Sequence, residues 1–423
     1  MGAMRRVVKF GGTSIATPEM VREAARHIAR LVEYGEQVAV VVSAPGNATS
    51  ELLEAIYAVS DGAVRFGETC EFAALGEEQS VHLLTAALRS LGLSAQPFLP
   101  RSTESWPIIA DIEDLSPLAT AKVNEERPFT LRAQQTASRF QRFVLPHLRV
   151  GTVPVIAGFF AVDSAQHVVA LGRGGSDITA FIVAREISAD EVVIVTDVKG
   201  VLSADPRLAA NPRLLAELTL SDLEMISGAG ARVIHPRALA FKTEFLNVRL
   251  IDYRELDRLE QTGTSVLGVS ETTLYRNPDE LSMITLVGDL GELADMQATL
   301  LDWLTAQQLK PCAVSMSRRF ICVYLPSSVA EGAYASLHAA LSARHTELTN
   351  ISLRGGIGEL RLRSAKFIDQ PGVLAEFTGV LANARVNIIE MITGLTDISV
   401  FIPQADMERA EALLQRVLQH YAR

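Results

Sequence analysis

A lysine and a pair of glycines precede an amphipathic helical pattern near the start of the chain. Lys9 lies near the end of an apolar stretch, and Gly11 and Gly12 follow it in the sequence KFGGTS. Glycines let a backbone approach an anion closely, and a helix N-terminus adds free N–H groups and a partial positive charge. The helix is expected to start at Thr17-Pro18, an N-cap followed by a proline in the first turn. This order predicts a phosphate site with Lys9 as a point charge, although a Gly-Gly turn between strand and helix is also common without any ligand.

A second glycine cluster, LGRGGSD, runs from Leu171 to Asp177 and leads into another helical pattern. Arg173 can hold a carboxylate or a phosphate through two parallel hydrogen bonds. Asp177 can orient a lysine ammonium or carry a metal-bound water. An ordinary loop does not need backbone donors, a guanidinium and a carboxylate together. The cluster therefore predicts a second part of an anion-binding site.

Apolar strands that alternate with helical segments are expected to position these side chains. The alternation predicts an α/β fold with a largely parallel sheet sandwiched by helices. Thr196 and Asp197 directly follow one of these strands. Open α/β sheets bind ligands at the carboxyl ends of their parallel strands, so both residues are candidates for the site. The expected strands are Val7 to Phe10, Val38 to Val42, Val153 to Ala157, Val192 to Val195 and Val248 to Ile251.

Composition limits the classes of function. With 423 residues, 48% of them apolar, the chain is expected to form two or three domains with sizeable cores. The net charge of −10 and the lack of a Lys/Arg-dense run argue against a nucleic-acid surface. No apolar run approaches membrane-spanning length, and no apolar signal segment follows the opening MGAMRR. Three cysteines without zinc-binding spacing fit reduced thiols, so we expect a cytoplasmic protein.

Seven motifs resemble those of the aspartate kinase family, within the wider amino-acid kinase superfamily. They are KFGGTS from Lys9, VVSA from Val41, LGEEQS from Leu75, GRGGSD from Gly172, TDVKGV from Thr196, ADPR from Ala204 and GARVIHPRAL from Gly230. The resemblance implies transfer of the ATP γ-phosphate to the side-chain carboxylate of L-aspartate, the first step of lysine, threonine and methionine biosynthesis. It also implies that Mg²⁺ accompanies ATP. We expect this ion mainly on the phosphates with several waters and assign it no protein ligand.

The resemblance implies a role for each matching residue. Lys9 would contact the transferring phosphate and Asp177 would orient the basic groups around it, which makes these two the catalytic pair. No general base is needed, because the attacking carboxylate is already ionised near neutral pH. The residues assigned to substrate binding are Arg173 on the α-carboxylate, Glu77 on the α-ammonium, and the hydroxyl donors Ser43, Thr49 and Ser176. The residues assigned to nucleotide binding are Lys9, Gly11, Gly12, Thr196, Asp197, Asp205, Arg207 and Arg232.

Several of these residues also have ordinary structural explanations. Glu77 lies in a helical stretch, where it could be solvated or paired. Ser43 could end a strand through a local backbone hydrogen bond, and Asp205 could start a turn with Pro206. His235 is expected to be a packed side chain rather than a catalytic one. The joint occurrence of the motifs, rather than any one residue, favours a kinase.

Some positions depart from the usual family pattern. Leu202-Ser203 replaces Tyr-Thr in the nucleotide segment, and Arg232 replaces a lysine. Val169-Ala170 replaces Thr-Thr ahead of GRGGSD, and Ala110-Asp111 replaces Thr-Asp. These changes leave two alternatives open. One is a kinase of the same fold that phosphorylates another carboxylate, and the other is a weakened homologue that serves as an amino-acid-sensing regulatory subunit.

The tail contains an internal repeat. Shifting it by 77 positions aligns Pro326 with Pro403, and apolar helical positions align in the same register. The two copies resemble tandem ACT modules, which are small ferredoxin-like βαββαβ units that bind amino acids. Polar residues without periodicity from 270 to 279 separate these copies from the first domain. The expected domains are a catalytic domain over 1–272 and ACT modules over 280–345 and 355–423.

An amino-acid effector, lysine or threonine, is expected at the second module. The loop that contains Asp369, Gly372 and Val373, together with the pair Asn387 and Ile388, could grip an amino-acid carboxylate near a helix N-terminus. The first module lacks the Pro-Gly of this loop, so its effector site is expected to be lost. Alternatively, both modules serve only as dimer surfaces that bury sheet edges. In both cases we expect a homodimer or a higher homo-oligomer formed through the modules.

Overall fold

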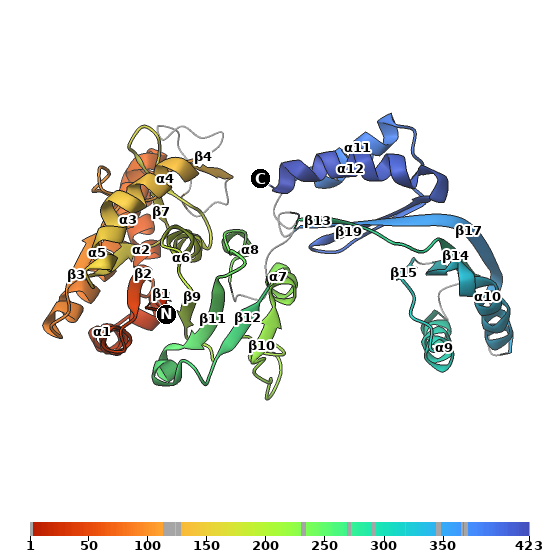
Figure 1. Cartoon of the computed structure of the whole chain (residues 1–423), viewed down its shortest axis with the longest axis horizontal. Helices are drawn as coiled ribbons and strands as arrows, with labels where there is room; N and C mark the ends of the chain where they lie inside the picture. Colours follow the sequence, from red (N-terminus) through yellow and green to blue (C-terminus); the bar gives the residue numbers. More distant parts are fainter. Residues whose placement is uncertain are drawn as a thin grey trace. The chain divides into compact units, whose positions relative to one another are not determined.

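The chain divides into two units between Ser270 and Glu271. The computed structural model (Figure 1) describes residues 3–112, 123, 128–229, 234–268, 272–288, 293–317, 319–343, 348–364, 367 and 371–422. An eight-stranded sheet forms the centre of the first unit, and a seven-stranded sheet forms the centre of the second. Each unit has its own buried apolar clusters, which is the mark of a separate domain.

The first sheet is parallel except at one strand pair. Its strands are β1 (Arg5–Phe10), β2 (Gln37–Val42), β3 (Ala95–Phe98), β6 (Val153–Ala157), β9 (Glu191–Thr196), β10 (Glu217–Thr219), β11 (Asn247–Asp252) and β12 (Thr264–Leu267). Their order is β10-β12-β11-β9-β1-β2-β6-β3, and β11 and β12 are antiparallel. The run Val38 to Val42 is buried on both faces, as expected for a sheet between two helix layers. All five strands expected from the sequence are present.

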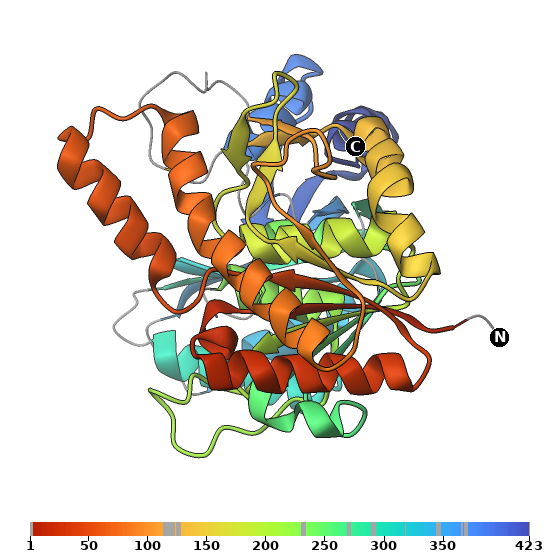
Figure 2. The same ribbon diagram turned by 90° about the vertical axis from the view of Figure 1, so that its left-hand side faces the viewer.

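Helices cover both faces of this sheet. The helical elements are η1 (Gly12–Ile15), α1 (Pro18–Glu33), α2 (Ala48–Ser60), α3 (Phe66–Ser90), α4 (Ala133–Arg139), η2 (Phe140–Val144), α5 (Leu145–Arg149), α6 (Gly175–Glu186), α7 (Leu220–Gly228), α8 (Pro236–Leu239) and η3 (Tyr253–Arg258). Figure 2 shows the sheet close to edge-on, with the red α1 on one side of the red strands and the yellow-green α6 on the other. α1 starts as expected, because the Thr17 hydroxyl accepts a hydrogen bond from the Met20 amide at 3.3 Å. Two antiparallel strand pairs, β4 (Ala110–Ile112) with β5 (Phe129–Leu131) and β7 (Phe160–Val162) with β8 (Val168–Ala170), complete the unit.

The carboxyl ends of four neighbouring strands lie at one edge of the sheet. Phe10 of β1 is in register with Val42 of β2 and Val195 of β9. Thr196, the last residue of β9, is in register with Asp252, the last residue of β11. The polar residues that follow these strands are therefore neighbours, as the parallel sheet predicts.

An ion-pair network lies at the amino ends of the strands. Arg6 in β1 is 1% exposed, and its guanidinium contacts Glu36 at 2.8 Å, Glu191 at 2.9 Å and Glu260 at 2.9 Å. Burial raises the pKa of the Glu36 carboxyl, and the charge of Arg6 opposes that rise. Losing such a cation is costly, because its carboxylate partners stay behind without a counter-charge.

We expect Arg6→Met to lower the free energy of unfolding of the first unit by about 3–5 kcal/mol. Urea unfolding can isolate this unit in a Trp303→Phe background, in which the buried Trp106 is the remaining tryptophan. Arg22→Met is the matched control, since Arg22 on α1 is 58% exposed and its one ion pair among the described residues is with Glu19. Its removal should change the free energy by less than about 1 kcal/mol. Equal effects of the two substitutions would contradict a structural role for the network.

The second unit consists of two modules that share one long strand. Its elements are β13 (Thr273–Arg276), β14 (Leu281–Gly288), α9 (Leu293–Ala306), β15 (Ala313–Met316), β16 (Phe320–Pro326), α10 (Ser327–Ser342), β17 (Leu348–Arg363), α11 (Val373–Asn383), β18 (Glu390–Thr393), β19 (Asp397–Pro403), η6 (Gln404–Asp406) and α12 (Met407–Ala422). β17 pairs with β14 over its first part and with β13 and β19 over its second part, and Figure 1 shows it running between the two modules. The orders β15-β16-β14-β17 and β18-β19-β17-β13 make both modules ferredoxin-like. The predicted fold class is confirmed.

The two modules pack against each other through sheet faces that carry no helix. In β16, Val323 belongs to the apolar cluster under α9 and α10, so the next residue, Tyr324, faces the other way. In β19, Val400 packs with α11 and α12, and Phe401 faces the other way. The rings of Tyr324 and Phe401 stack with their centroids 3.9 Å apart. The two modules therefore form one layered unit rather than two separate domains.

The polar segment between the units differs from expectation. The stretch from 270 to 279, interpreted as a break without periodicity, contains β13, which pairs with the second part of β17. A short strand at a sheet edge needs little apolar alternation, so its signal in the sequence is weak. The module ranges 280–345 and 355–423 stay predictions.

Candidate active site

Two residues from separate glycine turns form an ion pair at the carboxyl edge of the first sheet. The Nζ of Lys9, in β1, lies 2.7 Å from Oδ1 of Asp177, in the first turn of α6. The Lys9 side chain is 12% exposed and the Asp177 side chain is 14% exposed, and Oδ1 of Asp177 is itself buried. The structure thus brings together the two residues that the sequence assigns to catalysis, and their roles stay a prediction.

The first glycine turn is shaped by a neighbouring loop. The Gly11 amide donates to the Val195 carbonyl at 3.2 Å, and the Gly46 amide donates to the Gly12 carbonyl at 3.0 Å. A Cβ at Gly12 would collide with the carbonyl oxygen of Ala44. Gly12 therefore lets η1 pass against the loop that follows β2. The Gly11 amide is used within the protein, so it is not an open donor for a phosphate.

The second glycine turn requires a left-handed residue where α6 begins. Gly174 is the N-cap of α6 with φ of +72°, and a Cβ there would collide with the side chain of His235. His235 precedes α8 and packs on the turn that carries Asp177. Two motifs that lie far apart in the sequence, GRGGSD and HPRAL, are therefore in contact.

Glu77 is a buried carboxyl group on α3. It is 3% exposed, and burial raises its pKa to about 8, although hydrogen bonds from the Ala44 backbone and the Thr49 side chain oppose the rise. The negative charge of Glu78 raises the pKa of Glu77 further. Its Oε2 has no hydrogen-bond partner in the described part of the chain. Glu77 and Thr49, both assigned to substrate binding, therefore contact each other.

The other residues assigned to substrate binding lie around the same edge. The Ser43 amide donates to the Phe10 carbonyl at 3.1 Å, just past the paired ends of β1 and β2. Ser176 lies in the first turn of α6, and its Oγ is 2.6 Å from where a Cβ of Gly158 would be, so it packs against the loop after β6. Arg173 is exposed in the turn before α6. All three residues lie within or next to the elements that carry the ion pair.

The nucleotide segment is held by local contacts. The Thr196 hydroxyl donates to Asp197 at 3.2 Å, and Asp197 is exposed. Further along, Arg207 donates to Asp205 from its backbone amide at 2.9 Å and from its guanidinium at 2.7 Å. The Arg207 side chain, followed by its backbone amide, lowers the pKa of Asp205 to about 2. Asp205 starts a turn, which is the structural alternative for this residue, because the amides of Leu208 and Ala209 donate to its carbonyl at 3.0 Å and 2.9 Å. Arg232 lies outside the described residues.

Sequence reasoning missed a second buried carboxylate at this edge. Asp252 is 1% exposed and accepts hydrogen bonds from Nε of Arg254 at 2.8 Å and Nη2 at 2.6 Å. Nη2 also donates to the Asp197 carbonyl at 3.0 Å. Burial acts to raise the pKa of Asp252, but hydrogen bonds from Arg254 outweigh it, and the pKa lies below its ordinary value. The sequence contained a signal for this residue, because Asp252 directly follows the expected strand Val248 to Ile251, as Asp197 follows its own strand.

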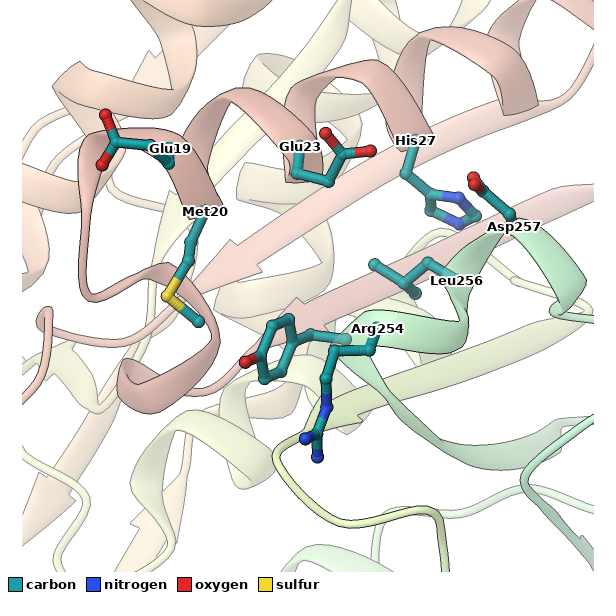
Figure 3. Close-up of a pocket in the computed structure, with 8 residues that line it drawn as sticks. Glu19, Met20, Glu23, His27, Arg254, Leu256 and Asp257 are labelled. Atoms are coloured by element: carbon teal, nitrogen blue, oxygen red, sulfur yellow. The ribbon is translucent and has the colours of Figure 1, made fainter.

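Two cavities border this arginine. One, of about 370 Å³, lies between α1 and η3 and is shown in Figure 3. The other, of about 500 Å³, is lined by Lys199, Asp252, Arg254, Glu255, Asp257 and Arg258. Neither is lined by Lys9, Asp177 or Glu77. The lining of the second cavity includes Lys199 of the nucleotide segment.

The residues assigned to an effector site lie at the start of α11 and before β18. Gly372 is the N-cap of α11 with φ of +86°, and Val373 is buried at its first position. Ile388 is half-buried against the same apolar cluster as Val373, whereas Asn387 is exposed. Asp369 lies outside the described residues.

The described residues contain neither a cluster of metal ligands nor a membrane-spanning helix. No group of three or more His, Cys, Asp or Glu residues there is arranged to hold a metal ion. No helix in those same ranges is long and apolar enough to cross a membrane.

The sequence of the chain matches the profiles of two known families. The profile of the Amino acid kinase family matches residues 4–252, and an ACT domain profile matches residues 352–416. The chain belongs to the amino acid kinase family. The predictions of a kinase enzyme and of a resemblance to aspartate kinases with ACT modules are confirmed.

Relatives of this amino acid kinase match nearly its whole length. Aspartokinase 2 of Bacillus subtilis is 27% identical over 414 residues, covering 96% of this chain and 95% of that protein. An aspartokinase of Thermus thermophilus is 28% identical over 423 residues, covering 98% of each chain. Among solved structures, aspartate kinase from Synechocystis matches with a TM-score of 0.73 and 25% identity, over 98% of this chain and 69% of that one. Aspartokinase III of E. coli in complex with aspartate and ADP has a TM-score of 0.53 at 20% identity over 96% of this chain and 98% of that one, which supports the fold alone.

Proposed function

We propose that this amino acid kinase transfers the γ-phosphoryl group of ATP to the side-chain carboxylate of L-aspartate, giving 4-phospho-L-aspartate and ADP. The observation that carries the proposal is the 2.7 Å ion pair of Lys9 and Asp177 between two glycine turns. The aspartokinase names of relatives that cover nearly the whole chain support the choice of acceptor.

Lys9 and Asp177 would act on the transferring group. A carboxylate oxygen of aspartate forms the new bond to phosphorus while the bond to the bridging oxygen of ADP breaks. Catalysis of this step depends mainly on positioning and on neutralising charge. Lys9 would supply positive charge at the phosphoryl oxygens, and Asp177 would hold the ammonium in place. No proton has to be removed, because the acceptor carboxylate is already ionised.

The remaining residues would bind and orient the two substrates. Arg173 would hold the α-carboxylate of aspartate, Glu77 its α-ammonium, and Ser43, Thr49 and Ser176 would add hydroxyl donors. The segment from Thr196 to Arg207 would bind ATP, together with Gly12 and Arg232. Mg²⁺ on the phosphates would supply further charge neutralisation. We expect this ion mainly on the ATP phosphates with several waters, and we assign it no protein ligand.

Trapping the acyl phosphate with hydroxylamine tests the reaction directly. We expect ATP-dependent product with L-aspartate and at least about tenfold less with L-glutamate or N-acetyl-L-glutamate at equal concentrations, since a longer acceptor misplaces the reacting carboxylate. Turnover of another acceptor alone would replace the proposal with a kinase of that carboxylate. Absence of turnover with every acceptor would favour the regulatory-subunit alternative.

We further infer feedback regulation through the ACT modules and a place at the start of lysine, threonine and methionine biosynthesis in the cytoplasm. Gly372 and Val373 at the N-terminus of α11, near the core that holds Ile388, support an amino-acid site in the second module. Lysine and threonine, added separately to the same assay, should reveal inhibition by at least one of them. A homo-oligomer formed through the modules is part of this proposal.

A further inference from the structure

Arg254 connects two elements that follow adjacent strands. It lies in η3, after β11, and its Nη2 donates to the carbonyl of Asp197, the first residue after β9. In Figure 3 its side chain points away from α1, toward the yellow-green loop. Because Thr196 and Asp252 are in register, this contact ties the ends of β9 and β11 just beyond the sheet.

The guanidinium is held in one orientation by several contacts. Nε and Nη2 contact the two carboxylate oxygens of Asp252 at 2.8 Å and 2.6 Å, which is a fork geometry that lysine cannot reproduce. The guanidinium carbon also lies 5.2 Å from the centre of the Tyr253 ring. Its side chain is nevertheless 60% exposed, so this fixed orientation does not come from burial.

The contact falls where the nucleotide segment has few other anchors. The next anchor along the chain is Val201, whose amide donates to the hydroxyl of the buried Thr264 at 2.8 Å. Gly200, just before it, has φ of +135° and packs against the same hydroxyl. Arg254 and Thr264 therefore hold the two ends of a short turn, and Arg254 holds the end next to Thr196.

We propose that Arg254 is a positioning residue for the nucleotide: its contacts with Asp252 and the Asp197 carbonyl fix the start of the nucleotide segment and thereby set nucleotide affinity. The inference rests on the proposed function in one respect, the assignment of Thr196 and Asp197 to nucleotide binding. Arg254 touches no reacting atom. Its loss weakens ADP and ATP binding and leaves the phosphoryl-transfer step itself unchanged.

Titration calorimetry of ADP against the full chain tests this inference. We expect Arg254→Met to weaken ADP binding by about tenfold or more, and KM for ATP to rise by a similar factor while kcat stays within about threefold. Arg254→Lys should also weaken binding, because it keeps the charge and loses the fork. Arg258→Met is the matched control: Arg258 lines the same cavity, and its side chain makes no hydrogen bond or ion pair with the described residues. It should bind ADP like the wild type.

A double variant separates a loss of ADP affinity from a loss of stability. Arg254→Met leaves the carboxylate of Asp252 buried and unpaired, which by itself destabilises the unit. The double variant Asp252→Asn with Arg254→Met removes both charges and still lacks the contact to Asp197, so it should recover thermal stability but not ADP affinity. ADP affinity within twofold of the wild type in the double variant, or full recovery in Arg254→Lys, would overturn the inference. A wild type that binds ADP but does not phosphorylate aspartate would overturn the proposed function alone, and a wild type that binds no ADP would overturn both.

Discussion

Replacing Lys9 with methionine is expected to lower kcat by about 10³-fold, while KM for ATP and for aspartate changes by less than about tenfold. The ammonium lies at the end of β1, 2.7 Å from Asp177, and is partly reachable. Charge on the phosphoryl oxygens has to be neutralised most strongly while the group is in transit, so the loss should fall on kcat. Initial rates with both substrates varied measure the two parameters separately.

Two matched variants sharpen this prediction. Asp177→Asn keeps an oxygen that can accept from the Lys9 ammonium but removes the charge, so kcat should fall by a smaller factor, about tenfold. Lys310→Met removes an exposed lysine from the second unit and should leave kcat unchanged. A loss in Lys9→Met that appears wholly in KM for ATP would show that Lys9 binds the nucleotide without assisting the transfer. The assignment of Lys9 as catalytic would then be wrong.

The parts of the site that could be predicted lie in short sequence motifs that contain the reactive side chains. KFGGTS and GRGGSD each combine glycine with a charged residue next to a helix start, and the structure joins Lys9 and Asp177 from these two segments. The tie between Arg254 and Asp197 could not be predicted in this way. It depends on the register of β9 and β11, which are separated by about fifty residues of chain and meet only in the folded sheet.

The same limit applies to the glycines and to the fold of the second unit. The sequence assigns Gly11 to nucleotide binding. In the structure its amide donates to the Val195 carbonyl, because β1 and β9 are neighbours in the sheet. Alternation of strands and helices predicted the parallel sheet from local pattern alone. It could not reveal that β13 completes the module formed by β17 and β19, since a four-residue edge strand leaves no periodic signal.

Aspartate affinity is expected to rise with pH and to level off above about pH 8. Glu77 has a pKa of about 8 in the unliganded enzyme, so near pH 7 its carboxyl is mostly protonated. Pairing with the α-ammonium requires the ionised form, and KM for aspartate should therefore fall as pH rises through this range. Glu77→Gln should raise KM for aspartate by about 10²-fold at pH 8 and abolish its pH dependence, with KM for ATP unchanged. KM for aspartate measured from pH 6 to 9 tests both statements.

The neighbouring glutamate provides a matched control. Glu78 on the same helix is also 3% exposed and pairs with Arg101, and its charge is one cause of the raised pKa of Glu77. Glu78→Gln should keep the pH dependence of KM and shift its midpoint to lower pH. Loss of the pH dependence in Glu78→Gln, with retention in Glu77→Gln, would show that Glu78 rather than Glu77 is the titrating group.

The free energy of unfolding should also depend on the protonation of Glu77, but folding favours the neutral carboxyl, whereas aspartate binding favours the ionised one. A folded pKa of about 8 against an ordinary value of 4.5 means that the folded state favours the neutral carboxyl. The unfolded chain releases this proton above about pH 4.5, so the stability that neutral Glu77 contributes is present below that pH and is lost as pH rises through 8. Glu77→Gln remains neutral, and its free energy of unfolding should therefore exceed that of the wild type by a margin that grows between these limits. A variant that is more stable at pH 8 and yet binds aspartate poorly would show that Glu77 is retained for the substrate rather than for the fold.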